Sequence, residues 1–256
     1  MHVSTDYVYS ALSLKNDGVY PIEVPCNEYG MQKLLGEKNV SLEYSSWPEG
    51  HLIARMSWLY GETKRPLFMH KILAQAYKSL VAASNGSAAD ADPHILAACD
   101  CYGSPTSAKS AAVIIYRLIY EGLYGIVNCW PALNTSRWDF AASIVEAYSN
   151  IIDSRLRKVR VESVCSSAFK QAICHPTFEN ANDAMRIPYG YIAYQPFKIS
   201  ISKFNCFLKK ANEIVKDKRD FSWWLEELPR KEDFKQQILK MLSKDELDAL
   251  SKIEVS

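Results

Sequence analysis

The sequence has no long apolar run and no excess of charge of one sign. None of its apolar stretches reaches the roughly 18 residues that a membrane-spanning helix needs, and its N-terminus does not have the basic and apolar regions of a signal peptide. The 30 Lys and Arg against 29 Asp and Glu give a net charge of +1, which offers no electrostatic reason to bind nucleic acid or an anionic membrane. We therefore expect a cytoplasmic protein with neither of these partners.

Metal-binding and disulfide patterns are also missing. The seven cysteines contain no CxxC pair, and Cys99 and Cys101 form the only close pair. The five histidines are scattered and form no HExxH motif. Without a second half, the pair Cys99 and Cys101 cannot complete a zinc site. We expect reduced thiols, as is usual in the cytosol, and no metal.

What is present is an ordinary globular composition with alternating strand and helix patterns. The chain has 256 residues, of which 48% are hydrophobic, and it can bury a core. Alternating strands and helices predict an α/β fold with a parallel sheet. We predict strands at 3–9, 51–61, 94–99 and 125–130, helices at 28–44, 67–80, 106–122, 134–149, 201–215, 234–242 and 247–253, and mostly irregular structure over 151–200.

The stretch YGMQK, residues 29–33, carries the clearest chemical signal. On a helix, residues four apart lie on one face, so Tyr29 and Lys33 can point at the same ligand. An ammonium near a phenol favours the phenolate and lowers the pKa of the phenol. Such a tyrosine can give a proton to an oxygen that gains negative charge, or take one back. An exposed Tyr–Lys pair without function remains the alternative.

The strand VSTDYVY, residues 3–9, adds a hydroxyl to this picture. In open α/β sheets, ligands bind outside the carboxyl ends of the parallel strands. Thr5 or Ser4 could donate a hydrogen bond there to a substrate carbonyl. Ordinary β-propensity of Ser and Thr is the alternative reading.

Five segments, taken in order, resemble the dTDP-4-dehydrorhamnose reductase family of the extended short-chain dehydrogenase/reductase superfamily. They are STDYVY (4–9), EYGMQKLLGE (28–37), ARMSWLYG (54–61), DCYGSPTSAKSAA (100–112) and GIVNCWPALNTSRWDFAASIVEAY (125–148). The resemblance implies part of a Rossmann-type doubly wound sheet over 1–150 with interleaved substrate-lobe segments. It further implies a smaller α/β substrate-binding lobe over 151–220 and a helical extension over 221–256.

The same resemblance implies roles for the matched residues. Tyr29 would be the general acid, and Lys33 its partner and a ribose ligand of NADP or NAD. Thr5 would polarise the substrate carbonyl, Asp6 would help to bind substrate, and Trp58 would pack on the sugar. The reaction implied is reduction of the 4-keto group of a nucleotide-linked 4-dehydro-6-deoxy sugar.

The family's glycine-rich GxxGxxG turn, which receives the cofactor's pyrophosphate, has no counterpart among the ten dispersed glycines. We therefore expect most of the cofactor site to be missing and the chain to be a fragment.

An alternative function is that of a non-catalytic regulatory subunit similar to the β subunit of methionine adenosyltransferase. The sequence leaves open a protein partner or a homodimer. In that case Trp223, Trp224 and the segment 234–242 would cover a protein partner.

Overall fold

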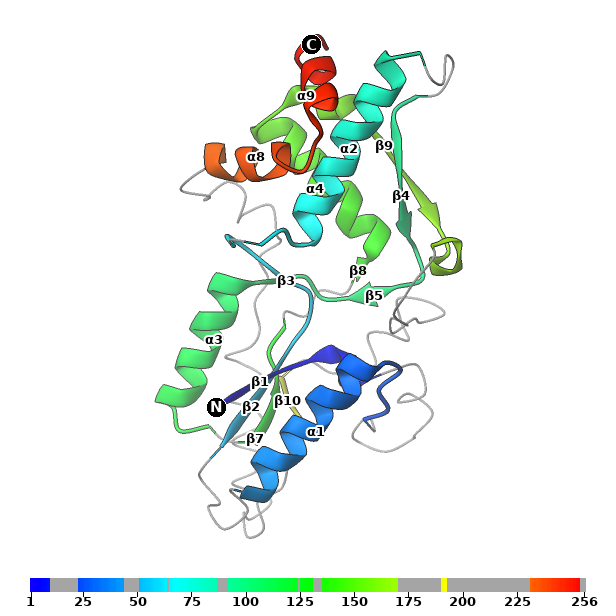
Figure 1. Cartoon of the computed structure of the whole chain (residues 1–256). Helices are drawn as coiled ribbons and strands as arrows, with labels where there is room; N and C mark the ends of the chain where they lie inside the picture. Colours follow the sequence, from blue (N-terminus) through cyan, green and yellow to red (C-terminus); the bar gives the residue numbers. More distant parts are fainter. Residues whose placement is uncertain are drawn as a thin grey trace. The chain divides into compact units, whose positions relative to one another are not determined.

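A computed structural model describes residues 1–9, 23–43, 51–63, 65–86, 92–123, 125–130, 135–169, 190–192 and 231–253. The chain divides into two compact units (Figure 1). The first unit comprises Met1–Leu59, Asp100–Thr135 and Phe169–Arg219, and the second comprises Tyr60–Cys99, Ser136–Ala168 and Asp220–Ser256. The functional domains implied by the resemblance remain a prediction.

A four-stranded sheet with the order β1-β2-β7-β10 forms the centre of the first unit. Strands β1, β2 and β7 are parallel, with Thr5 of β1 opposite Met56 of β2, and β10 is antiparallel to β7. The predicted α/β class with a parallel sheet is thereby confirmed. The strands are β1 (His2–Thr5), β2 (Leu52–Met56), β7 (Gly125–Asn128) and β10 (Gly190–Ile192).

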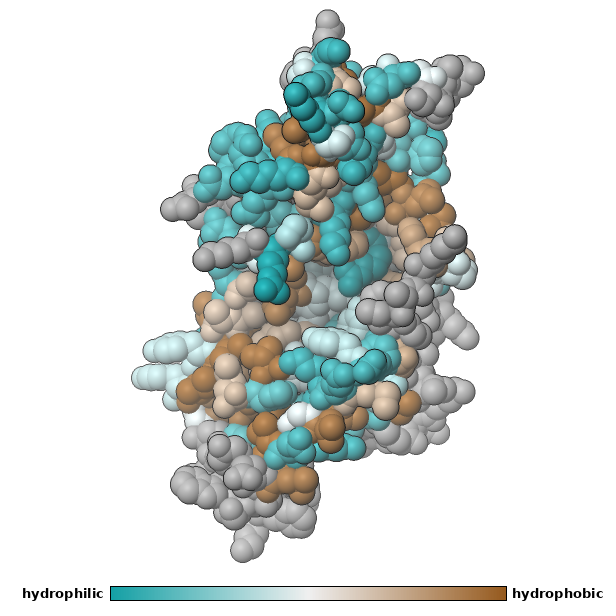
Figure 2. All heavy atoms as spheres, in the orientation of Figure 1, coloured by the Kyte–Doolittle hydropathy of each residue, from teal (hydrophilic) through white to brown (hydrophobic). Residues whose placement is uncertain are grey.

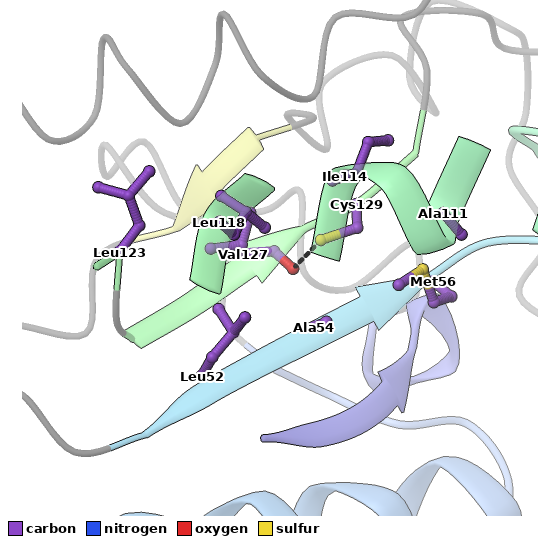
Figure 3. Close-up of a cluster of buried hydrophobic side chains, with 9 residues drawn as sticks. All are labelled: Leu52, Ala54, Met56, Ala111, Ile114, Leu118, Leu123, Val127 and Cys129. Atoms are coloured by element: carbon purple, nitrogen blue, oxygen red, sulfur yellow. Dashed lines mark hydrogen bonds between the residues drawn. The ribbon is translucent and has the colours of Figure 1, made fainter. Parts of the chain in front are cut away.

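Helices α1 (Glu28–Glu43) and α3 (Ala108–Tyr120) cover opposite faces of this sheet (Figure 1). Successive residues of a strand point to opposite faces. Ala54 packs in an apolar cluster with Leu118 of α3 and Val127 of β7 (Figure 3), whereas Arg55 hydrogen-bonds to Glu37 of α1. One helix on each face is the doubly wound arrangement.

The second unit packs helices around a separate two-stranded parallel sheet. Strand β4 (His94–Ala98) pairs with β9 (Arg160–Val164). Ser136 caps helix α4 (Arg137–Ile151), because its hydroxyl accepts a hydrogen bond from the backbone N–H of Asp139 at 3.0 Å. Its helices are α2 (Phe68–Ser84), α4 (Arg137–Ile151), α8 (Lys231–Leu239) and α9 (Lys244–Ser251), with 3-10 turns η3 (Ser154–Lys158) and η4 (Ser166–Ala168).

The apolar face of α8 is occupied within the second unit. Phe234 and Ile238 are buried, and the Phe234 ring lies 4.6 Å from the ring of His70 and 6.0 Å from that of Tyr148, centroid to centroid. The part of 234–242 that we expected to cover a protein partner is therefore used inside the chain. Trp223, Trp224 and the helix predicted at 201–215 lie outside the described residues.

Two predicted strands end earlier than the sequence pattern indicates. Residues 3–9 form β1 only as far as Thr5, because the Thr5 hydroxyl accepts a hydrogen bond from the backbone N–H of Tyr7 at 3.3 Å and starts the 3-10 turn η1 (Asp6–Val8). The strand predicted at 51–61 is interrupted where Trp58 adopts a positive φ of 33°. The remaining short strands are β3 (Leu59–Tyr60), β5 (Tyr102–Gly103), β6 (Thr106–Ser107) and β8 (Thr135–Ser136).

Large apolar side chains also reach the surface of both helices that cover the first sheet. Figure 2 shows brown atoms among hydrophilic ones over α1 and α3. They belong to Met31, Leu35 and Leu42 on α1 and to Val113 and Ile119 on α3.

Within the described ranges, no helix is long and apolar enough to cross a membrane.

Candidate active site

Thr5 and Asp6 lie where β1 ends and η1 begins. The Thr5 hydroxyl donates a hydrogen bond to Asp6 Oδ1 at 3.1 Å, and the other carboxylate oxygen of Asp6 accepts one from the Ser57 hydroxyl at 2.6 Å. Thr5 is buried, and Asp6 is half-buried. Both residues are therefore held at the carboxyl edge of the parallel sheet, where we expected the Thr5 hydroxyl to lie.

Tyr29 lies in the first turn of α1, beside the turn that follows Thr5. Its ring meets the Tyr7 ring edge-on, with centroids 5.8 Å apart, and 48% of the residue is exposed. The approach depends on Gly30, because a Cβ atom there would lie 2.2 Å from the backbone oxygen of Tyr7. The phenol therefore faces solvent close to the end of β1 and is available to a ligand.

Lys33 lies one helical turn after Tyr29 and also faces β1. Its Nζ donates a hydrogen bond to the backbone oxygen of Val3 at 2.8 Å. Lys33 therefore contacts β1 itself at Val3, and Tyr29 contacts the turn after β1 at Tyr7. In this arrangement, however, the Lys33 ammonium contacts the backbone and the Thr5 hydroxyl contacts Asp6, so convergence on a single ligand oxygen remains a prediction.

Trp58 follows β2, the strand next to β1. Its φ of 33° lies in the left-handed region, which costs a non-glycine residue about 1–3 kcal/mol. The Trp58 carbonyl accepts a hydrogen bond from the backbone N–H of Thr106 at 3.2 Å. Because β1 and β2 are parallel neighbours, Thr5 at the end of β1 and Trp58 just after the end of β2 lie at the same edge of the sheet.

Ser57 was not identified from the sequence, whereas Gly103 lies in a segment that resembled the reductases. Ser57 links Asp6 to the backbone N–H of Ser104, which donates to the Ser57 hydroxyl at 3.1 Å. Gly103 lies under the indole, since a Cβ atom there would come within 2.3 Å of Trp58 Cε2. Both residues stand in segments that matched the reductases, but nothing in the local sequence indicates that they meet.

A buried ion pair holds α1 against the sheet. Arg55 is fully buried, and its guanidinium contacts Glu37 of α1 at 2.5 Å and Glu23 at 3.1 Å. It also donates a hydrogen bond to the Tyr9 hydroxyl, and burial raises the pKa of Tyr9 to about 12. The cluster positions the helix that carries Tyr29 and Lys33.

The described residues around Thr5, Tyr29 and Lys33 do not include a cluster of metal ligands. Among the residues that the structure describes, no group of three or more His, Cys, Asp or Glu side chains could hold a metal ion. The donors present are hydroxyls, one phenol and one ammonium, which suit the hydroxyls of a ribose or a sugar.

Three bacterial enzymes are among the solved structures that share the fold of this chain. The dTDP-4-dehydrorhamnose reductase from Yersinia enterocolitica is 26% identical over 68% of this chain and 54% of that one, with a TM-score of 0.52. The Bacillus anthracis reductase, solved with NADP, is 28% identical over 68% of this chain and 53% of that one, with a TM-score of 0.50. A third, from Clostridium acetobutylicum, shares the fold at 22% identity and a TM-score of 0.53, over 72% of this chain and 56% of that one.

This chain thus spans about half the length of the solved relatives that it matches. No curated protein matches the sequence significantly. A model of one protein family, described as the RmlD substrate binding domain, matches residues 1–182. That match covers more than half of the chain and includes Thr5, Tyr29, Lys33 and Trp58, so the protein belongs to the RmlD substrate binding domain family, as its resemblance to dTDP-4-dehydrorhamnose reductases predicted.

Proposed function

We propose that this chain carries the catalytic residues of an NAD(P)H-dependent reductase that acts on the 4-keto group of a nucleotide-linked 4-dehydro-6-deoxy sugar. The observations that support the proposal are the contacts of α1 with β1 and the turn after it: Lys33 binds the Val3 carbonyl of the strand that ends at Thr5, and Tyr29 packs on Tyr7 in the following turn. Membership of the family and similarity to reductases that act on dTDP-4-dehydrorhamnose support the choice of substrate class.

Tyr29 is the proton donor in this proposal. When hydride reaches the carbonyl carbon, the carbonyl oxygen gains negative charge and takes the phenol's proton. The exposed phenol can approach a ligand without rearrangement of α1. Lys33 lies one helical turn away on α1 and, in this proposal, carries the positive charge that faces the oxygen left negative by this step.

Lys33 also fits the nicotinamide cofactor, which supplies the hydride when bound. An ammonium has three donors, and one of them is used on Val3 O, so two remain for ribose hydroxyls. Thr5 polarises the substrate carbonyl once its hydroxyl turns from Asp6 Oδ1 toward the ligand. Trp58 offers an indole for the sugar ring.

The assignment is tested by single-turnover reduction of dTDP-4-dehydrorhamnose with NADPH. We expect Tyr29→Phe to slow the chemical step about 100-fold or more, because a positioned acid contributes about 10²–10⁴-fold. Tyr120→Phe is the matched control, since Tyr120 is an exposed tyrosine on α3 and should keep the original rate. A Tyr29→Phe rate within about twofold of the original would rule out the role of this phenol.

A further inference from the structure

We propose that Ser57 is a positioning residue of the candidate site, whose hydroxyl joins Asp6 to the loop at Ser104 and thereby holds the Trp58 indole against Gly103. In this proposal the Asp6 carboxylate has a structural role, because it accepts the hydrogen bond of the Ser57 hydroxyl. It rests on the proposed function only for the identity of the ligand that Trp58 receives.

The Ser57 hydroxyl is a junction of three segments of the first unit. It donates to Asp6 Oδ2 at 2.6 Å, at the end of β1. It accepts from the backbone N–H of Ser104 at 3.1 Å, in the loop before α3. Ser57 itself follows β2 and is 2% exposed, so water cannot easily replace either bond.

Asp6 is well suited to this role. One of its carboxylate oxygens accepts from Thr5 and the other from Ser57. A hydrogen bond to an ionised acceptor is about twice as strong as a neutral one. The carboxylate thus orients the Thr5 hydroxyl and the Ser57 hydroxyl together, and the pair links the proposed carbonyl-binding group to the Trp58 turn.

Trp58 needs such support because its backbone is held at a φ of 33°. Strained backbone persists only where its surroundings over-determine it. Ser57, the residue before Trp58, hydrogen-bonds to Asp6 and Ser104. The carbonyl of Trp58 accepts a hydrogen bond from the backbone N–H of Thr106. The indole then rests where the missing side chain of Gly103 leaves room.

If the Ser57 hydrogen bonds fix the Trp58 indole, a ligand meets an aromatic surface in one position. An indole face packs on the apolar C–H face of a pyranose ring and buries it from water. If the ligand is a nucleotide-linked hexose, the Ser57 junction decides where that ring can lie relative to Thr5 and Tyr29. Gly103 and Ser57 then belong to the determinants of substrate position without touching the reacting atoms.

The test uses ¹⁹F NMR of the full chain labelled with 5-fluorotryptophan, with the Trp58 resonance assigned by its loss in Trp58→Phe. We expect Ser57→Ala to move the Trp58 resonance by more than its line width. The Trp138 resonance, whose indole N–H donates to Val161 O in the second unit, should stay in place. Ser107→Ala is the control, because the buried Ser107 hydroxyl has no hydrogen-bond partner among the described residues.

Two further variants keep the result decisive if Ser57→Ala does not fold. Asp6→Asn retains the shape but weakens the acceptor and should move the same resonance less. Gly103→Ala should displace it directly. If Ser57→Ala or, failing that, Asp6→Asn leaves the Trp58 resonance where it was, or moves it no more than Ser107→Ala does, the junction does not position the indole and the proposal is overturned.

A final titration with dTDP-glucose separates this proposal from the proposed function. Movement of the Trp58 resonance on addition of the nucleotide sugar in the original chain, reduced in Ser57→Ala, supports both. No movement with ligand, together with movement in Ser57→Ala alone, leaves the junction intact and counts against a sugar site at Trp58. Ligand-induced movement that Ser57→Ala does not change overturns the positioning role.

Discussion

Trp58 offers a direct measurement of backbone strain at the candidate site. It is the one non-glycine residue with positive φ in the described part of the chain. Glycine adopts such a conformation without the steric cost that alanine pays. Both Trp58→Gly and Trp58→Ala remove the indole, so they differ mainly in backbone strain.

We expect Trp58→Gly to be more stable than Trp58→Ala by about 1 kcal/mol, measured by urea unfolding. Trp138 lies in helix α4, where glycine is less favourable than alanine by about 1 kcal/mol. The same pair of substitutions at Trp138 should therefore show the opposite order. The same order at both positions would show that Trp58 is not strained in solution.

Glu37 is expected to contribute strongly to the free energy of unfolding of the first unit through its buried ion pair with Arg55. Its carboxylate pairs with fully buried Arg55, and its own side chain is 3% exposed. Removal of the Glu37 charge leaves the buried guanidinium with Glu23 as its remaining carboxylate partner, and breaking a buried pair costs up to about 3–5 kcal/mol. Glu37→Gln should lower the free energy of unfolding by about that amount in urea titrations.

Glu162→Gln is the matched control, because Glu162 pairs with Arg160 on the surface. Exposed pairs of this kind contribute about 0–1 kcal/mol. Comparable losses in the two variants would contradict the buried role of Glu37.

At the scale of elements, α1 is placed by a close approach of its first turn to η1. A Cβ atom at Gly30 would lie 2.2 Å from the backbone oxygen of Tyr7, whereas one at Gly36 would lie 3.3 Å from the His2 ring. A backbone oxygen in the turn after a strand cannot move as an imidazole ring can. The two helix glycines therefore have different reasons to be glycine.

We expect Gly30→Ala to destabilise the chain, although alanine in a helix interior is normally favoured over glycine by about 1 kcal/mol. Gly36→Ala should be close to neutral or stabilising, because the propensity gain offsets a small shift of His2. Thermal unfolding of both variants gives the comparison. A stabilising Gly30→Ala would mean that the turn of Tyr29 does not lie against Tyr7 in solution.

The elements themselves were largely predictable from the sequence, and their ends were less so. Helix α1 begins at Glu28, as its pattern indicates. The strand predicted to continue through Tyr9 stops at Thr5 because one side-chain hydrogen bond favours a turn. Local hydrogen bonds of Ser and Thr compete with strand pairing, and residue composition alone does not show which one wins.

At the scale of the molecule, the candidate site was predictable in part, because its motif residues lie on two elements with a known relation. A strand end and the first turn of the following helix meet in any open α/β sheet, which places Thr5 near Tyr29. The contact of Ser57 with both Asp6 and Ser104 joins residues 51 and 47 positions apart. Such a junction is a product of tertiary packing, and no local pattern encodes it.

Acidification should lower the free energy of unfolding of both units, because each contains buried histidine. Burial lowers the pKa of His2 and His51 in the first unit and of His70 in the second, below the ordinary value of 6.5. The N-terminal ammonium lowers the pKa of His2 and His51 further, and Lys33 lowers that of His2. Glu37 and Gln237 oppose the shift at His2 and His70 respectively.

The sign follows from which state binds the proton. Above pH 6.5 these histidines are neutral in both states. As the pH falls below 6.5, the unfolded chain takes up protons first, and the free energy of unfolding decreases. We expect lower stability at pH 5.5 than at pH 7.5 in urea unfolding, and a weaker pH dependence in His70→Asn. His94→Gln, at an exposed position, should keep the original dependence; equal pH dependence in all three proteins would show that His70 stays accessible to protons in the folded chain.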